Sequence, residues 1–375
     1  MHIDRFYKDL GKLLYPNKVV LIYGPRRVGK TTLVKEFLAS SNEKYKEDTG
    51  DNLSTREQLG SQSLDKIKDY AGNYKLIFID EAQKIPNIGI GLKLMVDHIP
   101  GIKIIATGSS SFELAGQVGE PLTGRKYTYT LFPIAQLEFT NFYSPFEMKE
   151  QLENWLVYGS YPDVWNVELH TEKVKYLEEL VDSYLLKDIL ELERVKDAKL
   201  LRDLLRLLAF QIGSEVSHAE LGTQLGIDSK TVGRYLDLFE KSFIIYNLRG
   251  FSRNLRKEVT KKSKYYFYDI GVRNALISNF NPLSHRNDQG QLWENFLFME
   301  RLKKCSYMGL YANNYFWRTW DQKEIDLIEE REGNLFGYEF KFGNKKIKEP
   351  KEWLQTYKNA QFQIINQDNY LEFIL

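Results

Sequence analysis

Short apolar runs alternate with amphipathic stretches over residues 19–137. The stretches TTLVKEFLAS (31–40) and IGLKLMVDHI (90–99) have helical spacing of their apolar residues, and they fall between the apolar runs VVLIY (19–23), KLIFID (75–80), KIIATG (103–108) and KYTYTLF (126–132). Such alternation is typical of a parallel sheet with helices on both faces. We therefore predict an α/β fold for the first part of the chain. The polar segment 40–74 leaves room for a further strand at EKYKEDTGD, which the pattern does not place.

The pattern changes beyond residue 138. Apolar residues recur at i, i+3 and i+4 in three segments interrupted by the turn-rich YGSYPDVW, which predicts a helical lid or connector: LENWLVYG, EKVKYLEELVDSYLLKDILELE and DAKLLRDLLRLLAFQIG. Two short helices then flank a turn at residues 226–228, and a basic hairpin follows them. This order is that of a winged helix-turn-helix. After the linker NPLSHRNDQG, a helix followed by strands predicts a second α/β unit.

Composition restricts the class of protein. A chain of 375 residues exceeds the size of one ordinary core, and 43% hydrophobic residues suffice for several cores. The formal net charge of +1 excludes a chain that is basic throughout, as well as an acidic disordered one. The single Cys305 cannot form an internal disulfide, and we find neither a signal peptide nor an apolar run of about 18 residues. We expect a cytoplasmic protein that does not associate with membranes.

The segment GPRRVGKT (24–31) has the spacing of a phosphate-binding loop, GxxxxGK[ST], and it joins a predicted strand to a predicted helix. In such loops the backbone N–H groups surround the β-phosphate, the lysine reaches the β- and γ-phosphates, and the Ser or Thr hydroxyl binds Mg²⁺. The sequence therefore predicts ATP and Mg²⁺ as ligands. The expected nucleotide contacts in this segment are Gly24, Pro25, Arg26, Arg27, Val28, Gly29, Lys30, Thr31 and Thr32.

Two carboxylates follow the apolar strand LIFI at residues 76–79. Asp80 is expected to hold Mg²⁺ together with Thr31, and Glu81 to polarise the attacking water. The alternative is that both side chains only cap a turn. Because a phosphate loop lies upstream, we predict hydrolysis with Lys30 and Glu81 as catalytic residues.

Two further groups have weaker signals. Thr107 or Ser109, at the end of the strand KIIAT, could sense the γ-phosphate, because ligands of such sheets bind at the carboxyl ends of the strands. A plain serine-rich turn is the alternative. Arg125 could stabilise the charge of the transition state in its own or a neighbouring subunit. It could equally be an ordinary surface arginine.

Four blocks carry a family resemblance: GPRRVGKTT, LIFIDEAQ, ATGSSSFEL and GRKYTYTLFPI. In this order they resemble AAA-type P-loop ATPases. More narrowly, with YGSYPDV and KYYFYDIGVRNAL, the chain resembles bacterial and archaeal predicted ATPases joined to a winged helix and a PD-(D/E)XK nuclease-like domain. The resemblance implies an ATPase domain at 1–138, a helical connector at 139–209, a winged helix at 210–280 and a nuclease-like domain at 281–375.

Residues 249–264 contain seven Lys or Arg residues and one Glu, which gives a local charge of +6. A winged helix can place its second helix in a major groove while a basic wing neutralises phosphates. The candidate contacts with double-stranded DNA are Lys230 and Arg234 on the helix and Arg253, Arg256, Lys257, Lys261 and Lys262 on the hairpin. The alternative is a winged helix that contacts protein.

Carboxylates recur near the end of the chain. In YEFK the alternation of a strand puts Glu339 and Lys341 on one face, where Asp326 from the preceding strand could complete a second Mg²⁺ site. This arrangement resembles the PD-(D/E)XK core, and Glu294 matches its helix acid. A fold of this kind without cleavage is the alternative.

Taken together, these patterns predict an Mg²⁺-dependent ATPase that couples its nucleotide state to a winged-helix and nuclease-like module acting on DNA. The alternative is a nucleotide-dependent switch or scaffold that binds a protein partner, or a second copy of itself, and does not cleave nucleic acid.

Overall fold

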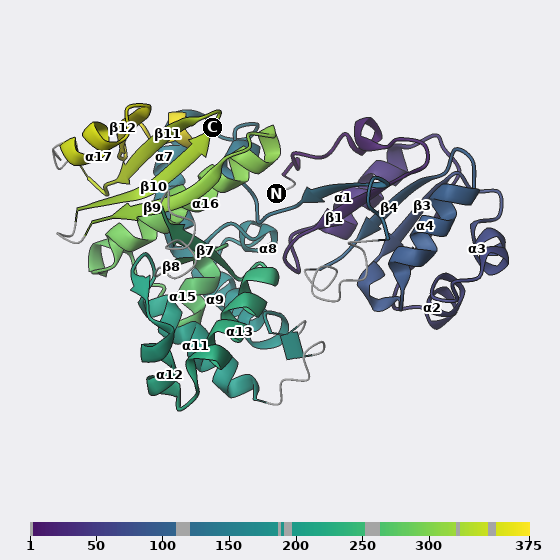
Figure 1. Cartoon of the computed structure of the whole chain (residues 1–375), viewed down its shortest axis with the longest axis horizontal. Coiled ribbons are helices and arrows are strands. Elements are labelled where there is room, and N and C mark those ends of the chain that lie inside the picture. Colours follow the sequence, from purple (N-terminus) through teal and green to yellow (C-terminus); the bar gives the residue numbers. More distant parts are fainter. Residues whose placement is uncertain are drawn as a thin grey trace.

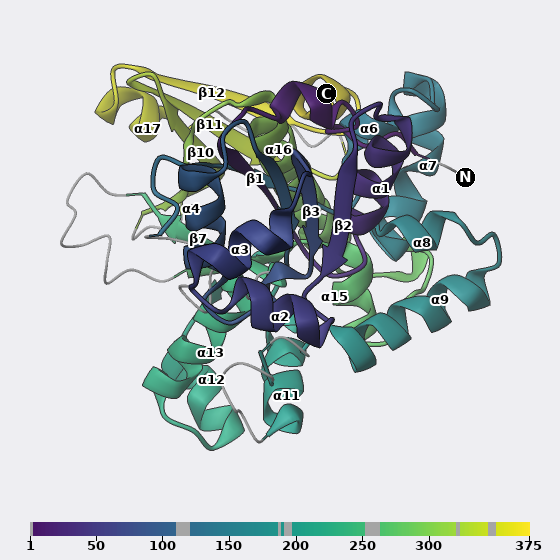
Figure 2. The same ribbon diagram turned by 90° about the vertical axis from the view of Figure 1, so that its right-hand side faces the viewer.

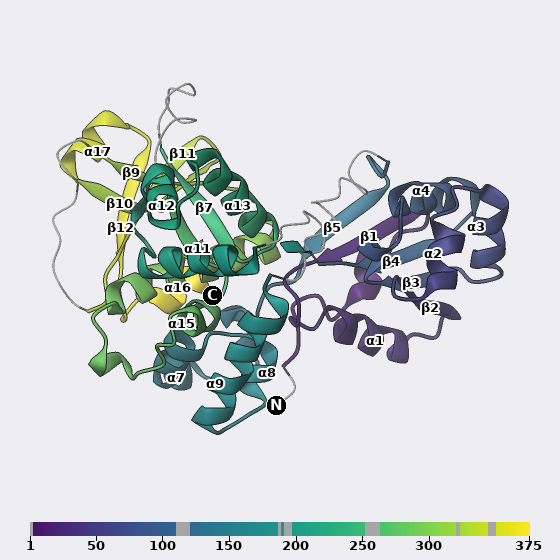
Figure 3. The ribbon, with the colours of Figure 1, turned by 90° about the horizontal axis from the view of Figure 1, so that it is seen from below.

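A computed structural model describes residues 3–109, 121–186, 189–190, 197–251, 263–319, 323–343 and 350–375. The chain forms two lobes, an N-terminal lobe (residues 3–132) and a second lobe (133–375), and the amino terminus lies between them (Figures 1 and 3). Among the described residues, no helix has the length and apolar character needed to cross a membrane. The cytoplasmic location stays a prediction.

The N-terminal lobe contains a five-stranded parallel sheet in the order β2-β3-β4-β1-β5. Its strands are β1 (Lys18–Tyr23), β2 (Tyr45–Thr49), β3 (Leu76–Asp80), β4 (Lys103–Thr107) and β5 (Lys126–Thr130). The predicted α/β architecture is therefore confirmed. The strand that the pattern did not place is β2, whose sequence YKEDT lacks an apolar run because it lies at the sheet edge.

Helices cover both faces of this sheet (Figure 2). Along β1, Val20 and Ile22 belong to the hydrophobic cluster that contains α1, whereas Val19 and Leu21 face the cluster that contains α3 and α4. The helices of this lobe are α1 (Lys30–Ser40), α2 (Leu53–Leu59), α3 (Leu64–Ala71) and α4 (Ile88–His98), with 3₁₀ turns at Leu10–Leu13 and Ala82–Lys84. The period-two burial of β1 thus fixes which side each helix covers.

The second lobe begins with helices, as predicted for residues 139–209. They are α6 (Gln136–Phe139), α7 (Pro145–Tyr158), α8 (Pro162–Trp165), α9 (His170–Glu179), the π-turn Leu180–Tyr184 and α11 (Ala198–Phe210). Next come β6 (Glu215–Val216), α12 (His218–Leu225), α13 (Ser229–Lys241), β7 (Ile245–Gly250), β8 (Ser263–Phe267) and α15 (Ile270–Leu276). The last part holds a 3₁₀ turn at Leu283–His285, α16 (Gln289–Met308), β9 (Asn313–Arg318), β10 (Glu324–Arg331), β11 (Asn334–Phe340), α17 (Lys351–Thr356), β12 (Ala360–Ile365) and α18 (Tyr370–Ile374).

One seven-stranded sheet runs through the second lobe in the order β12-β11-β10-β9-β7-β8-β6. The joint is the parallel pairing of β7 with β9, where Arg249 lies opposite Tyr315. Strands from the predicted segments 210–280 and 281–375 therefore share one sheet. Residues of both segments also share one hydrophobic cluster. The predicted domain boundary at residue 280 therefore does not separate two hydrophobic cores.

The two signature segments YGSYPDV and KYYFYDIGVRNAL pack against each other. The buried carboxylate of Asp269 accepts hydrogen bonds from the N–H of Ser160 (2.7 Å) and from the N–H of Val272 (3.1 Å). Asn274 Nδ2 donates to the carbonyl of Val157 at 2.8 Å. A Cβ on Gly271 would lie 2.1 Å from the carbonyl oxygen of Tyr158, so only glycine permits this approach. These contacts fix the backbone that leads into α8.

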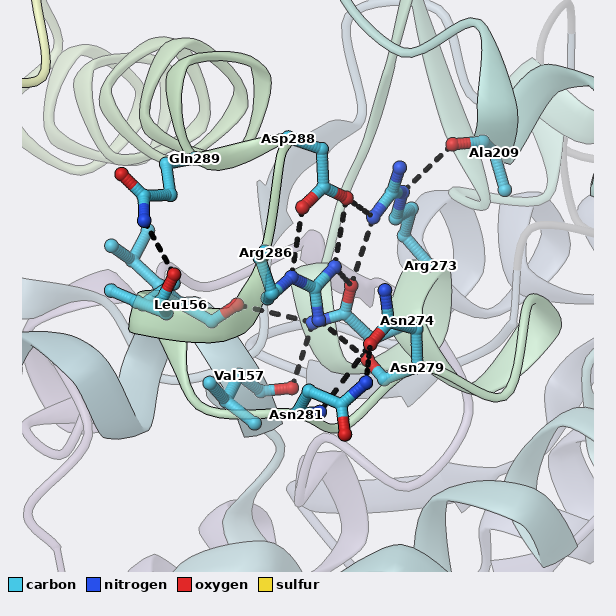
Figure 4. Close-up of polar contacts among 11 residues, drawn as sticks. Leu156, Val157, Ala209, Arg273, Asn274, Asn279, Asn281, Arg286, Asp288 and Gln289 are labelled. Atoms are coloured by element: carbon cyan, nitrogen blue, oxygen red, sulfur yellow. Dashed lines mark hydrogen bonds and ion pairs between the residues drawn. The ribbon is translucent and has the colours of Figure 1, made fainter.

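A cluster of charges ties the linker before α16 to the helices (Figure 4). The Asp288 carboxylate pairs with Arg273 Nη1 (2.5 Å) and with Arg286 Nε (2.8 Å), and Arg273 Nε donates to the carbonyl of Ala209 in α11. Burial alone would raise the pKa of Asp288. The hydrogen bonds and charges of the two guanidinium groups outweigh burial and lower the pKa of Asp288 to about 2.

We expect Asp288→Asn to lower the free energy of unfolding at pH 7 by about 2 kcal/mol, because two buried guanidinium groups lose their counter-ion. The folded-state pKa lies below the ordinary value, so this stabilisation is present above about pH 4 and is lost as pH falls through about 2. Urea unfolding at pH 7 and near pH 2 measures the difference. The exposed Asp237→Asn serves as the control, and equal stabilities of both variants at pH 7 would contradict the expectation.

Candidate functional site

The predicted phosphate loop joins β1 to α1 in the required order. Two glycines adopt positive φ: Gly24 at 146° and Gly29, the residue before α1, at 90°. A Cβ on Gly24 would lie 2.0 Å from the carbonyl oxygen of Leu131, so the loop passes this backbone at a distance that only glycine allows. The buried Lys30 folds back and its Nζ donates to the carbonyls of Gly24 (2.8 Å) and Pro25 (2.7 Å).

The carboxyl end of β3 meets the start of α1 at the predicted Mg²⁺ ligands. Thr31 Oγ1 donates to the Asp80 carboxylate, with distances of 2.9 and 3.1 Å to its two oxygens. Thr107 Oγ1, from the neighbouring β4, donates to the same carboxylate. Hydroxyl and carboxylate oxygens are the ligands that Mg²⁺ prefers. Thr31 and Asp80 therefore fit Mg²⁺ in type and in position.

Glu81 follows directly, in the left-handed conformation with φ of 48°. Gln83 Nε2 donates to Glu81 Oε2 at 2.5 Å and to Ser109 Oγ at 3.3 Å. The N–H of Glu81 donates to Thr107 Oγ1 at 3.3 Å. The structure thus brings together the predicted Glu81, Thr107 and Ser109. It adds Gln83, whose only signal in the sequence is its place in LIFIDEAQ.

A cavity of about 450 Å³ lies beside the loop. Ligand pockets commonly measure about 300–1,000 Å³, so the size suits a nucleotide. Both lobes line it. Loop and helix residues 26–33 with Glu36 and Glu81 form one side, and the other residues are Ile3, Arg5, Ile134, Pro162, Asp163 and Asn166. Pro162 and Asp163 belong to the YGSYPDVW segment and Asn166 follows it, and the sequence alone did not connect this segment with nucleotide binding.

Arg125 lies at the amino end of β5, because Lys126 pairs with Val19 whereas Thr130 pairs with Tyr23 beside the loop. Four residues of strand, at about 3.3 Å each, separate the two ends. Arg125 Nε donates to Asp97 Oδ1 at 2.7 Å. Strand direction takes Arg125 to the opposite edge of the sheet, which argues against the alternative that it serves the site of its own chain. A role in a neighbouring subunit stays a prediction.

Of the candidate DNA-contacting residues, Lys230 and Arg234 lie in the part of the chain that the structure describes. Lys230 and Arg234 are exposed on α13, which follows α12 after a turn. The Arg234 guanidinium lies 5.2 Å from the ring centroid of Tyr235. The hairpin residues Arg253, Arg256, Lys257, Lys261 and Lys262 lie outside the described residues. Their role in DNA binding stays a prediction.

The C-terminal carboxylates come together, but around a lysine. Lys264 Nζ, on β8, lies 3.0 Å from Glu294 Oε1 and 3.9 Å from Asp326 Oδ1, and it also contacts Glu324. Lys264 is only 2% exposed. Burial would lower the pKa of Lys264, but Glu294, Asp326 and Glu324 outweigh burial and raise it.

The other predicted members lie at the same place. Lys341 Nζ pairs with Glu339 Oε1 at 2.8 Å, and the N–H of Phe340 donates to Asp326 Oδ2 at 2.8 Å. Burial, followed by repulsion from Glu294 and Glu339, raises the pKa of Asp326 well above its ordinary value. In the described part of the chain, no group of three His, Cys, Asp or Glu side chains has the geometry of a metal site. In this arrangement Lys264 lies among Glu294, Glu324 and Asp326, and a second Mg²⁺ site formed by Asp326 and Glu339 stays a prediction.

Family models match three consecutive parts of the chain. Residues 16–140 match the model described as an AAA domain. Residues 149–283 and 289–372 match two domains of unknown function, DUF8612 and DUF4143. The chain therefore carries an AAA-type P-loop ATPase domain followed by two segments without an assigned function.

Similar whole chains occur in bacteria and archaea. An uncharacterized protein of Mycobacterium tuberculosis is 29% identical over 337 residues, covering 88% of this chain and 72% of its own. An uncharacterized protein of Methanocaldococcus jannaschii is 26% identical over 385 residues, covering 96% and 83%. Neither name states an activity.

Among solved structures, the Thermotoga maritima RuvB Holliday junction branch migration motor gives a TM-score of 0.29 at 18% identity, covering 64% of this chain and 84% of that one. The Pif1 helicase from Bacteroides gives 0.27 at 15% identity, covering 50% and 51%. These scores carry no argument about the activity of this chain.

We expect Gly24→Ala to weaken MgADP binding by at least about tenfold, because its Cβ would displace either the loop or Leu131. Isothermal titration calorimetry of the full chain measures the affinity. Gly290→Ala is the matched control, since a Cβ there meets nothing within 4 Å. Wild-type affinity in a folded Gly24→Ala variant would contradict the assignment of the loop.

Proposed function

We propose that this chain is an Mg²⁺-dependent ATPase whose nucleotide state controls the second lobe, and that the second lobe acts on double-stranded DNA. The observation that carries the ATPase proposal is the contact of Thr31 with Asp80 at the start of α1, with Glu81 as the next residue. The AAA match over residues 16–140 supports ATP as the nucleotide.

The site residues have separate tasks in this mechanism. Backbone N–H groups of the loop and the amino end of α1 would bind the phosphates. Lys30 would exchange the carbonyls of Gly24 and Pro25 for phosphate oxygens. Thr31 and Asp80 would hold Mg²⁺, which when bound neutralises charge on the β- and γ-phosphates. Glu81 would orient the attacking water and accept its proton.

The coupling proposal rests on the shared pocket. Its walls come from the loop of the N-terminal lobe and from Pro162, Asp163 and Asn166 of the second lobe. A nucleotide in this cavity would contact both lobes, and loss of the γ-phosphate would change the contacts on one side only. Hydrolysis would thereby favour a different arrangement of the lobes.

The DNA proposal rests on the order of elements in the second lobe. The order α11, β6, α12, α13, β7, β8, with β8 antiparallel to both β7 and β6, is the order expected of a winged helix. In that fold α13 would enter the major groove with Lys230 and Arg234. Without the buried Lys264, residues 249–263 hold six Lys or Arg residues and one Glu, and this local charge of +5 would provide a phosphate-binding wing.

The second candidate function is a nucleotide-dependent switch or scaffold that binds a protein partner or a second copy. The observation that favours it is the burial of Lys264 among the C-terminal carboxylates. Because Lys264 lies among these carboxylates, we do not include nucleic-acid cleavage in the proposal.

Lys30→Ala is expected to reduce ATP turnover by at least about 100-fold, whereas Glu81→Gln is expected to bind MgATP normally and to hydrolyse it at least about 100-fold more slowly. Phosphate release measures turnover, and calorimetry measures binding. Lys12→Ala, whose side chain is 80% exposed, is the control. Turnover at the wild-type rate by Lys30→Ala would refute the assignment.

Duplex DNA should bind with an affinity that falls steeply with salt, by about 0.9 in the log–log slope for each phosphate contact. The double change Lys230→Ala and Arg234→Ala should reduce that slope by about 1 to 2, because two cations leave α13. Fluorescence anisotropy at several salt concentrations measures the slope. Weak binding that is independent of salt would favour the switch or scaffold function, and Lys12→Ala should leave the slope unchanged.

A further inference from the structure

Arg5 lies buried at the junction of the phosphate loop with the second lobe. Its guanidinium reaches three different elements: Nη1 donates to the carbonyl of Val28 in the loop, Nη2 donates to the carbonyl of Phe132 (2.7 Å), and Nε donates to Glu138 Oε1 on α6 (3.0 Å). Arg5 is 9% exposed. Three acceptors in a fixed fork hold this side chain in one position.

Tyr307, near the end of α16, completes the cluster from the other end of the sequence. Its hydroxyl accepts a hydrogen bond from the N–H of Phe132 (3.2 Å) and lies 3.5 Å from Arg5 Nη2. Its ring stacks on Phe6 with centroids 4.8 Å apart and planes within 3°. Phe132 is therefore held at both backbone groups, by Arg5 through its carbonyl and by Tyr307 through its N–H.

These contacts reach the phosphate loop at two points. Arg5 holds the carbonyl of Val28 directly. Phe132 follows Leu131, whose carbonyl lies against Gly24 and whose N–H donates to Tyr23 at 2.7 Å. The beginning and the end of the loop are thus both supported by residues that Arg5 and Tyr307 fix.

Helix α16 also forms hydrogen bonds with residues at the other wall of the nucleotide cavity. Glu300 accepts a hydrogen bond from the N–H of Gln136 at 2.6 Å. Lys303 Nζ donates to Ser160 Oγ at 3.2 Å and to the carbonyl of Ile134 at 3.3 Å. Ile134 lines the cavity, and Ser160 lies just before α8. Helix α16 therefore contacts residues on both sides of the cavity. Tyr307 contacts the side of the phosphate loop, and Glu300 and Lys303 contact the side of the second lobe.

A planar trans peptide points its C=O and its N–H in opposite directions. When Arg5 holds the carbonyl of Val28, it also sets the direction of the N–H of Gly29, which lines the cavity. We infer that Arg5 and Tyr307 are positioning residues that keep the phosphate loop in its anion-binding conformation and make nucleotide affinity depend on the placement of α16. This inference rests on the proposed nucleotide binding.

The loop N–H groups would contact the β-phosphate of ADP and ATP alike, in the ground state and in the transition state. Loss of their orientation should therefore weaken both nucleotides while turnover at saturation changes little. A residue that only stabilises the fold would lower the melting temperature, and the folded fraction would bind nucleotide as the wild type does. Separate values of KM and kcat distinguish the two roles, because lost positioning raises KM whereas a smaller folded fraction lowers the apparent kcat and leaves KM unchanged.

The test uses Tyr307→Phe, which removes one hydroxyl and keeps the ring, and Arg5→Lys, which keeps the charge and loses the fork. In the full chain, Kd for MgADP and KM for ATP should rise about fivefold in Tyr307→Phe and about tenfold or more in Arg5→Lys, with kcat within about twofold of wild type. In the double variant, the Kd for MgADP should rise by no more than the product of the two single-variant increases, because both residues act on the same backbone.

The matched controls are Tyr311→Phe, whose side chain is 93% exposed, and Arg206→Lys, which is exposed on α11. Both should bind MgADP as the wild type does. Wild-type Kd and KM in Tyr307→Phe would overturn the inference while leaving the proposed function intact. Failure of the unaltered chain to bind nucleotide would instead overturn the proposed function. If Arg5→Lys does not fold, Tyr307→Phe alone decides.

Discussion

The close approach of the phosphate loop to the backbone at Leu131 and Phe132 is the constraint on which the nucleotide site and the lobe junction both depend. A Cβ at Gly24 would lie 2.0 Å from the carbonyl oxygen of Leu131, so the loop and the residues that follow β5 must move together. Arg5 donates hydrogen bonds to the carbonyl of Phe132 and to the carbonyl of Val28, and so joins the end of β5 to the loop. Any shift of the second lobe that displaces Phe132 must therefore change the loop that would bind the phosphates.

Buried charges make this junction specific. Arg5 with Glu138 and Lys264 with Glu294 each join distant segments of the chain within a region shielded from water, and Lys303 pairs with Glu300 within α16. Removal of one member leaves the other charged and buried, which typically costs about 3–5 kcal/mol. Such pairs tolerate only a few discrete arrangements. Such discrete arrangements would suit the proposed coupling, in which the placement of the two lobes depends on the nucleotide between them.

Local patterns predicted the elements and motifs that depend on neighbours in sequence. Apolar runs gave β1, β3 and β4, and the GxxxxGK[ST] spacing predicted the loop. The edge strand β2 has no apolar run to detect, and Lys264 was counted with a basic hairpin because its carboxylate partners are distant in sequence. Arg5 has no motif at all. The placement of Arg125 could have been predicted, since an arginine before a parallel strand lies opposite the ligand edge.

Hydrogen–deuterium exchange of the full chain, with and without MgADP, tests most directly whether the nucleotide binds between the two lobes. The account predicts slower exchange in the loop at residues 24–32, in residues 160–166 leading through α8, and at the end of α16 around Tyr307. Slower exchange confined to the loop, with residues 160–166 and α16 unchanged, would contradict it.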